Sequence, residues 1–252
     1  TNVNIRNPSN QKAKKILNWE PKISLVEGLN SIKDFIWVIE LYLRLRFWKI
    51  LVPNKNIRRT ILKMINSGGA AHIGSALSMV EILNTVFKNV DILKIKNNDP
   101  KRDRVILSKG HATAGLYGVM HHHGLLEKSL IDTYFKNGTV LAGHASHHVP
   151  CVEHSTGGLG HGLSVGVGVA IGMRSKKIDS NVFVILGDGE MQEGSNWEAI
   201  MLAGHLKLEN LTILIDINNL GQVGKLEDCC TLEPLDKKLE SFNFNTYDVN
   251  GH

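Results

Sequence analysis

Three short runs of the chain are almost continuously apolar, and longer stretches between them place apolar residues three and four positions apart. The short runs read RVIL at 104–107, NVFVILGD at 181–188 and LTILIDIN at 211–218, and they predict strands. The longer stretches predict helices; they cover residues 57–65, 78–87, 108–120, 160–174, 195–206 and 234–242. A further short run, NTYDV at 245–249, predicts a last strand.

Strands that alternate with helices in this way predict an α/β fold, with a doubly wound, mostly parallel sheet and helices on both faces. Ligands of such sheets bind at the carboxyl ends of the strands. The turns LSKGH, LGDG and IDINNLG all follow predicted strands, so we expect them to meet at that edge. Ser78 opens one predicted helix and Glu81 follows three positions later, which is the spacing of a capping box.

The charge of the chain is unevenly distributed. The 252 residues have a formal net charge of +5. Residues 1–63 hold 13 Lys and Arg against 4 Asp and Glu, a net of +9, whereas the other 189 residues hold 16 and 20, a net of −4. We therefore expect two parts: a basic N-terminal extension with an amphipathic helix, residues 1–54, and an α/β domain, residues 55–252.

A basic extension can bind nucleic acid or a membrane surface, but a solvated helical face is the simpler interpretation. No nucleic-acid-binding motif occurs in the sequence. The most apolar run, residues 35–52, contains Glu40, Arg44, Arg46 and Lys49, which makes it a poor membrane-spanning helix. The three cysteines lack CxxC spacing and the first residues are polar. We therefore expect a cytoplasmic protein that binds neither nucleic acid nor a membrane.

One turn has the composition of a ligand site. Asp188 stands between Gly187 and Gly189, directly after the second predicted strand. Glycines let a phosphate approach the backbone N–H groups, and a carboxylate suits Mg²⁺ or Ca²⁺. An ordinary β-turn has the same composition. After 28 residues, which hold one helix and one strand, Asn218 returns to this edge with an amide oxygen. Glu190 is interpreted as an acid that favours the start of a helix.

Gly-Asp-Gly followed after 28 residues by Asn-Asn resembles the thiamine diphosphate binding motif, and its surroundings resemble those in transketolases. The similar segments are AAHIGSALS, RDRVILSKGHATAGLYGVM, LAGH, CVEHSTGGLGHGLS, GDGEMQEGSNWEAIMLAGHLKLENLTILIDINNLGQVG and LEPLDKKLESFNFNTYDVNGH. They cover residues 55–252 in the order and at the spacing of the family, so several independent motifs agree.

The resemblance implies a site for thiamine diphosphate and a divalent cation, Mg²⁺ or Ca²⁺. The implied cation ligands are Asp188, Asn218 and the backbone carbonyl of Leu220. The implied cofactor contacts are Gly187 and Gly189 in the turn, Gly157 and Leu159 on the aminopyrimidine side, Glu193 at a subunit interface and His111 near the diphosphate.

His72, His111 and His144 match histidines that line the cofactor and substrate channel of transketolases, and they are the implied catalytic residues. His72 and His144 would reach substrate hydroxyl groups and move protons. The twelve histidines also suggest zinc as an alternative. However, adjacent histidines on a helix point in different directions, and no cysteine lies at ligand spacing, so a zinc site is not expected.

The sequence resembles only part of a transketolase. No segment matches the pyrimidine-binding domain, whose glutamate activates the cofactor, and the family's domain is expected to continue beyond DVNGH. The resemblance thus implies the N-terminal subunit of a split transketolase, which transfers a two-carbon ketol unit from a ketose to an aldose only with a C-terminal partner subunit. A homodimer or heterotetramer is implied. The alternatives are a non-catalytic paralogue or scaffold, or another class of thiamine diphosphate enzyme.

Some positions differ from the family pattern, and the first residues resemble a different family. Ala71, Gly158 and Gly221 stand where transketolases usually have other residues, but none of them is an implied metal ligand. Residues 1–34 resemble the C-terminal tail of a sugar-nucleotide epimerase without its catalytic residues, so no epimerase activity is implied. Together these resemblances imply a sugar phosphate or a sugar nucleotide as substrate.

Overall fold

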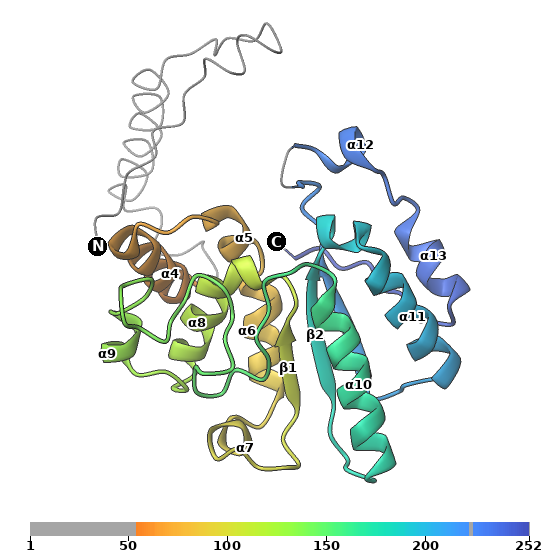
Figure 1. Cartoon of the computed structure of the whole chain (residues 1–252), viewed down its shortest axis with the longest axis horizontal. Coiled ribbons are helices and arrows are strands. Elements are labelled where there is room, and N and C mark those ends of the chain that lie inside the picture. Colours follow the sequence, from red (N-terminus) through yellow and green to blue (C-terminus); the bar gives the residue numbers. More distant parts are fainter. Residues whose placement is uncertain (1–53, 222–223, 252) are drawn as a thin grey trace, which may run out of the picture. The chain divides into compact units, whose positions relative to one another are not determined.

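A computed structural model describes residues 54–221 and 224–251 (Figure 1), which belong to a compact unit that runs from Pro53 to His252. The amphipathic helix expected at 35–52 and the epimerase-like segment at 1–34 lie outside the described residues. The elements, in chain order, are α4 (Lys55–Gly68), α5 (Ile73–Ser78), α6 (Val80–Asn89), α7 (Ile92–Lys96), β1 (Arg104–Leu107), η1 (Gly110–Ala112), α8 (Thr113–His122), α9 (Lys128–Ile131), α10 (His161–Ser175), β2 (Val182–Gly187), η2 (Gly189–Gln192), α11 (Gly194–Leu206), β3 (Leu211–Asp216), α12 (Leu226–Cys229) and α13 (Leu235–Ser241).

The three strands form one parallel sheet in the order β1-β2-β3, which confirms the predicted α/β fold. Leu107 pairs with Ile185, and Gly187 pairs with Asp216. The carboxyl ends of the strands therefore lie along one edge of the sheet. The turns that follow β1, β2 and β3 start from that edge, as the sequence predicts.

Successive strand residues face two different hydrophobic cores. Val105, Leu107 and Ile185 pack into a core with α4, α6 and α8, whereas Val182 and Val184 pack into a second core with α10, α11 and α13. Figure 1 shows these two sets of helices on opposite faces of the sheet. Burial on both faces explains why the strands are continuously apolar in sequence.

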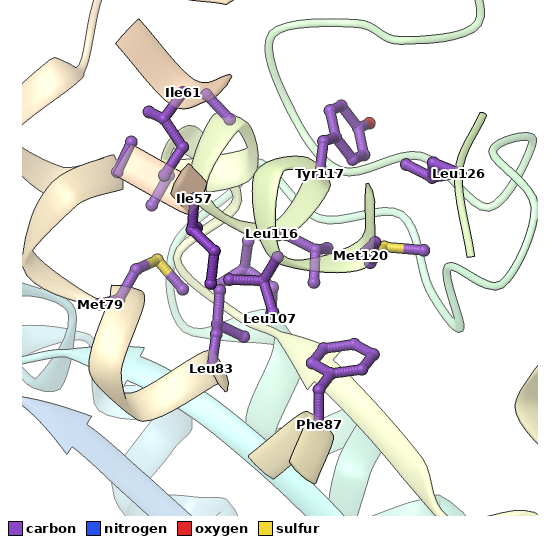
Figure 2. Close-up of a cluster of buried hydrophobic side chains, with 14 of the residues drawn as sticks. Ile57, Ile61, Met79, Leu83, Phe87, Leu107, Leu116, Tyr117, Met120 and Leu126 are labelled. Carbon is purple, nitrogen blue, oxygen red and sulfur yellow. The ribbon is translucent and has the colours of Figure 1, made fainter. Parts of the chain in front are cut away.

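The first core is built around α8. Ile57 and Ile61 from α4 and Leu83 from α6 are at most 1% exposed, and they gather around α8 next to Leu107 of β1 (Figure 2). Phe87 closes the cluster near the end of α6. Because residues 113–120 of α8 are buried on all sides, this stretch is mostly apolar rather than amphipathic.

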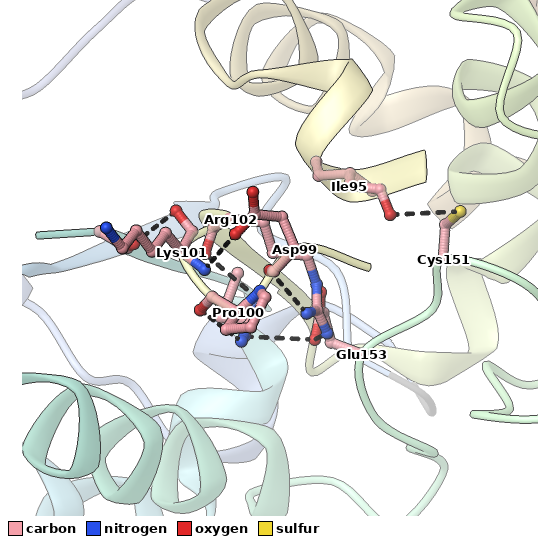
Figure 3. Close-up of polar contacts among 9 residues, drawn as sticks. Ile95, Asp99, Pro100, Lys101, Arg102, Cys151 and Glu153 are labelled. Carbon is pink, nitrogen blue, oxygen red and sulfur yellow. Dashed lines mark hydrogen bonds and ion pairs between the residues drawn. The ribbon is translucent and has the colours of Figure 1, made fainter. Parts of the chain in front are cut away.

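Polar contacts at both ends of β1 hold the segment that connects α9 with α10. At the edge where β1 begins, Arg102 donates from Nε and Nη2 to the carboxylate of Glu153 at 2.7 and 2.9 Å, and the Cys151 thiol faces the carbonyl oxygen of Ile95 (Figure 3). At the carboxyl edge, Thr156 Oγ1 donates to the carbonyl oxygen of Leu107 at 2.7 Å. The segment thus crosses the domain and returns to the edge where the predicted site lies.

The strand predicted at residues 245–249 does not form. Tyr247 and Val249 are 85% and 76% exposed, and no described strand pairs with this segment. A strand needs a neighbour for its backbone hydrogen bonds, and the sequence pattern alone does not supply one. Within the described residues, no helix is long and apolar enough to cross a membrane.

Candidate active site

One buried carboxylate ties the turn after β2 to the loop after β3. Asp188, 5% exposed, directly follows the last residue of β2. Its Oδ2 accepts the backbone N–H groups of Asn218 at 2.9 Å and Asn219 at 2.6 Å, and its Oδ1 accepts that of Gly189 at 2.8 Å. The Gly-Asp-Gly and Asn-Asn motifs therefore meet at the carboxyl edge of the sheet.

The loop after β3 folds back onto this turn. The side-chain oxygen of Asn218 accepts the N–H of Leu220 at 3.0 Å, and Asn219 has a φ of 60°, a left-handed conformation that asparagine tolerates better than most residues. A Cβ atom added to Gly189 would lie 3.7 Å from the carbonyl oxygen of Leu220. The structure thus brings the three predicted cation ligands into two adjoining loops.

The charges and oxygen atoms at this edge fit a divalent cation. Among Lys, Arg, His, Asp and Glu, the side chains that are buried in the described part of the chain are Lys109, Asp188, Glu190 and Asp216. When all are ionised, three carboxylates against one ammonium leave an excess of two negative charges. A carboxylate has about four lone-pair sites and an amide oxygen two. The hydrogen bonds above therefore leave acceptor capacity on Asp188 and Asn218 for a metal.

A buried ion pair that the sequence did not reveal adjoins Gly187, where an added Cβ atom would lie 3.8 Å from Nζ of Lys109. Lys109, which follows β1, donates from Nζ to Oδ2 of Asp216, the last residue of β3, at 2.6 Å. Ser78 Oγ donates to Oδ1 of the same carboxylate at 2.8 Å. Removal of one partner of such a pair typically costs about 3–5 kcal/mol, because the other charge stays buried and unpaired. The pair fixes the ends of β1 and β3 on either side of β2.

This contact also corrects the predicted capping box. Ser78 is the last residue of α5, and α6 begins after Met79 without a side-chain cap. Glu81 instead accepts hydrogen bonds from Nη2 of Arg58 at 2.8 and 2.7 Å. Ser78 and Glu81 therefore bind residues in distant segments and do not cap α6.

Glu190 lies in the first turn of η2, as expected of a helix-start acid, but the sequence did not reveal the contacts of its carboxylate. Its carboxylate is buried at 2% exposure and points inward, where Oε1 accepts the hydroxyl of Ser108 at 2.5 Å and the N–H of Gly160 at 2.9 Å. Its Oε2 accepts the N–H of Gly187 at 3.3 Å. Burial raises the pKa of Glu190, while these hydrogen bonds and the charge of Lys109 oppose that shift.

The three histidines predicted at the site form one cluster. The ring of His72 lies 5.3 Å from that of His111 and 6.2 Å from that of His144, measured between centroids. His72 adopts a φ of 67°, a strained conformation of the kind that occurs at functional sites. Desolvation, and then the charges of Lys109 and the other two histidines, lower the pKa of His111 to about 4. His111 is therefore neutral at physiological pH.

The glycine-rich segment TGGLG adjoins both parts of the site. A Cβ atom added to Gly157 would lie 3.5 Å from Cδ2 of His144, and the N–H of Gly160 reaches Glu190. Leu159, between them, is partly buried. Glu193 behaves differently: its side chain is exposed and does not cap α11, which starts at the next residue. Its backbone N–H nevertheless donates to the carbonyl oxygen of Glu190 at 3.1 Å, so it adjoins the buried cluster.

The comparisons with known proteins identify the family of the chain. The family described as "Transketolase, thiamine diphosphate binding domain" matches residues 53–252. An apulose-4-phosphate transketolase subunit of Actinobacillus succinogenes is 40% identical over 206 residues, which cover 79% of this chain and 73% of that protein. The 6-deoxy-6-sulfo-D-fructose transketolase subunit of a Clostridium species is 34% identical over 200 residues, which cover 78% and 72%.

Solved structures show the same fold. A variant of Pichia stipitis transketolase in complex with fructose 6-phosphate is similar with a TM-score of 0.71 and 30% identity. The match covers 77% of this chain and 30% of that one, so the chain spans less than a third of the length of the solved enzyme. Through residues 53–252, the chain belongs to the transketolase family.

Proposed function

We propose that this protein is the N-terminal subunit of a split transketolase that depends on thiamine diphosphate and Mg²⁺. With a C-terminal subunit that carries the pyrimidine-binding domain, it transfers a two-carbon ketol unit from a ketose to an aldose. The observation that carries the proposal is the pair of hydrogen bonds from Asn218 and Asn219 to the carboxylate of Asp188, because they join the two halves of the cofactor motif.

The oxygen atoms at this junction would hold the cation, Mg²⁺ or Ca²⁺. Its ligands are the side chains of Asp188 and Asn218 and the carbonyl of Leu220. Bound thiamine diphosphate would supply the carbanion chemistry that breaks and forms the carbon–carbon bond beside the ketose carbonyl. The residues that face this cofactor are Gly187, Gly189, Gly157, Leu159 and His111.

The histidine cluster serves the substrate. His72 and His144, whose side chains lie at the exposed side of the cluster, orient substrate hydroxyl groups and transfer protons. His111 is more deeply placed, and its low pKa keeps it neutral, so it acts through hydrogen bonds and adds no positive charge. A neutral imidazole can donate from one ring nitrogen and accept at the other.

The partner completes the site from outside this chain. Both relatives described above are named as transketolase subunits, which supports a second subunit here. Glu193 is exposed beside the cofactor turn, where it would meet that partner in a homodimer or a heterotetramer. We place the assembly in the cytoplasm, without nucleic acid or membrane as a partner.

We propose a ketose with an anionic group as the donor. The relatives are named for apulose 4-phosphate and 6-deoxy-6-sulfo-D-fructose, and both of these compounds carry an anion away from the reacting carbonyl. A sugar phosphate fits this pattern most simply. A sugar nucleotide, which carries its phosphates at another position, is the second class to assay.

The test is reconstitution of the chain with a protein of the same organism that carries a pyrimidine-binding domain. Ketol transfer is assayed with sugar phosphates and sugar nucleotides, and cofactor binding by calorimetry in the presence of Mg²⁺. We expect Asp188→Ala and Asn218→Ala each to weaken thiamine diphosphate binding by at least about 10- to 100-fold, because even replacing a group that only orients a metal ligand costs that much. Asp179→Ala, an exposed carboxylate before β2, is the control.

Two results would contradict the proposal. If the reconstituted complex does not bind thiamine diphosphate, the protein is a non-catalytic scaffold. If it binds the cofactor but forms products other than those of ketol transfer, it belongs with another class of thiamine diphosphate enzyme.

A further inference from the structure

Glu190 connects three segments that are far apart in the sequence. Its carboxylate accepts hydrogen bonds from Ser108 after β1, from Gly160 before α10 and from Gly187 at the end of β2. The backbone carbonyl oxygen of Glu190 also accepts Nδ2 of Asn196 in α11, at 2.7 Å. One residue therefore joins the ends of two strands and the start of a helix at the carboxyl edge.

Each of the three segments carries residues of the proposed cofactor site. Ser108 is three positions before His111, Gly160 directly follows Leu159, and Gly187 directly precedes Asp188. At two of these places a backbone N–H group donates to Glu190, so these hydrogen bonds set the orientation of the peptide groups themselves. Rotation of a peptide group there would move the neighbouring site residue with it.

The surroundings of Gly160 show how closely these segments are fitted together. Gly160 has a φ of 83°, and its carbonyl oxygen accepts Ser195 Oγ at 2.9 Å while its N–H reaches Glu190. A Cβ atom added at this position would come within 2.7 Å of Cβ of Glu193. The N–H and the carbonyl oxygen of Gly160 are therefore both hydrogen-bonded to the segment that contains Glu190. These two bonds fix the orientation of the turn.

We propose that Glu190 is a positioning residue of the cofactor site: its buried carboxylate holds the segments that contain His111, Leu159 and Asp188 at fixed places relative to one another. This rests on the proposed function, because it is thiamine diphosphate and its cation that these segments would grip. Glu190 acts through its neighbours and is not itself a ligand, since its oxygen atoms are directed to Ser108, Gly160 and Gly187.

Two substitutions separate the contacts of Glu190. In Glu190→Gln, the remaining oxygen can still accept from Ser108 and Gly160, but the new amide group places a donor against the N–H of Gly187. Glu190→Ala removes all three contacts. Ser108→Ala removes one contact and leaves the carboxylate in place. Glu209→Gln, at an exposed carboxylate on the opposite edge before β3, is the matched control.

The experiment measures thiamine diphosphate binding by calorimetry at fixed Mg²⁺, with the full chain and its partner subunit. The unfolding midpoint without cofactor is measured for each variant in parallel. We expect binding about 10- to 100-fold weaker in Glu190→Gln, as when a group that orients a metal ligand is replaced. Glu190→Ala should bind more weakly still and Ser108→Ala less so, while Glu209→Gln matches the wild type.

A positioning role and a purely structural role differ in one readout. Positioning predicts that Glu190→Gln loses cofactor affinity while its unfolding midpoint without cofactor stays close to that of the wild type. Equal affinity of the folded variants, with or without a lower midpoint, would overturn the inference. If Glu190→Ala does not fold, the cofactor affinities of Glu190→Gln and Ser108→Ala distinguish the positioning role from the structural one. If the wild type itself fails to bind the cofactor, the proposed function fails first and the inference fails with it.

Discussion

His111 is one residue through which pH acts on the stability of the fold. Its pKa is about 4 in the folded protein, whereas an unfolded histidine titrates near about 6.5. As the pH falls below that value, the unfolded chain binds a proton that the folded chain does not. The stability contributed by neutral His111 is therefore complete above pH ~6.5 and is lost as the pH falls towards 4.

We expect His111→Asn to reduce this loss of stability in acid. The effect of one such proton is at most ~1.4 kcal/mol per pH unit, and it is smaller here because the ring is partly exposed. Urea unfolding between pH 7 and 4.5 measures it. His122→Asn, at an exposed position on α8, is the control and should keep the acid dependence of the wild type. Identical profiles for all three proteins would contradict the prediction.

Single residues of the site could be predicted from the sequence where a motif fixes their environment. Asp188, flanked by two glycines, and Asn218 could be paired because a helix and a strand necessarily return the chain to the same edge. Glu190 could not, because nothing local distinguishes an acid that points to solvent from one that points inward. Lys109 and Asp216 are 107 positions apart, and neither lies in a pattern that reveals its partner.

At the level of elements, α10 shows why a glycine-rich helix suits this fold. Gly162 lies against the chain after β1, where an added Cβ atom would come within 2.6 Å of Cα of Ser108. Gly168, in the same helix, has nothing within 4 Å of such an atom. The two positions share a helical backbone but differ in the space around them. Alanine substitutions at the two positions therefore distinguish the effect of packing from the effect of helix propensity.

We expect Gly162→Ala to destabilise the fold and Gly168→Ala to stabilise it. A methyl group forced against the backbone typically costs about 1–3 kcal/mol, because the main chain must move. In open space, alanine gains about 0.5–1 kcal/mol over glycine within a helix. Chemical unfolding of the two variants and the wild type measures both effects. A stabilised Gly162→Ala variant would show that the contact between α10 and β1 is looser than these distances imply.

Helices and strands could be predicted from the sequence where both of their faces are buried. The prediction failed where a contact with a distant segment determines whether the element forms. The strands β1 to β3 are apolar because both faces are covered, and this pattern is visible in the sequence. Residues 245–249 contain Thr, Tyr and Val, which favour strands, but they have no neighbouring strand in the described residues. The sequence predicts the wrong helix boundary at Ser78, because the hydrogen bond from Ser78 to Asp216 spans 138 positions and no local pattern reveals it.

At the scale of the whole molecule, the described domain should fold without the basic extension. Residues 1–52 hold 9 Lys and Arg and 4 Asp and Glu, a net of +5, so residues 53–252 have no formal net charge. In the described part, the buried residues of both cores run from Ile57 to Leu235. We expect a chain of residues 53–252 to melt within ~2–4 °C of the full chain, the shift that corresponds to ~1 kcal/mol at this size.

A second, slightly shorter chain makes this prediction sharp. A chain that starts at residue 59 also lacks Asn54, Ile57 and Arg58. Ile57 is 1% exposed, Arg58 holds Glu81, and Asn54 accepts a hydrogen bond from Asn84 at 2.7 Å. Thermal unfolding, followed by circular dichroism, should therefore show a large loss for this chain and almost none for residues 53–252. Equal losses in both chains would mean that the extension is part of the fold, because the cores alone would then not account for stability.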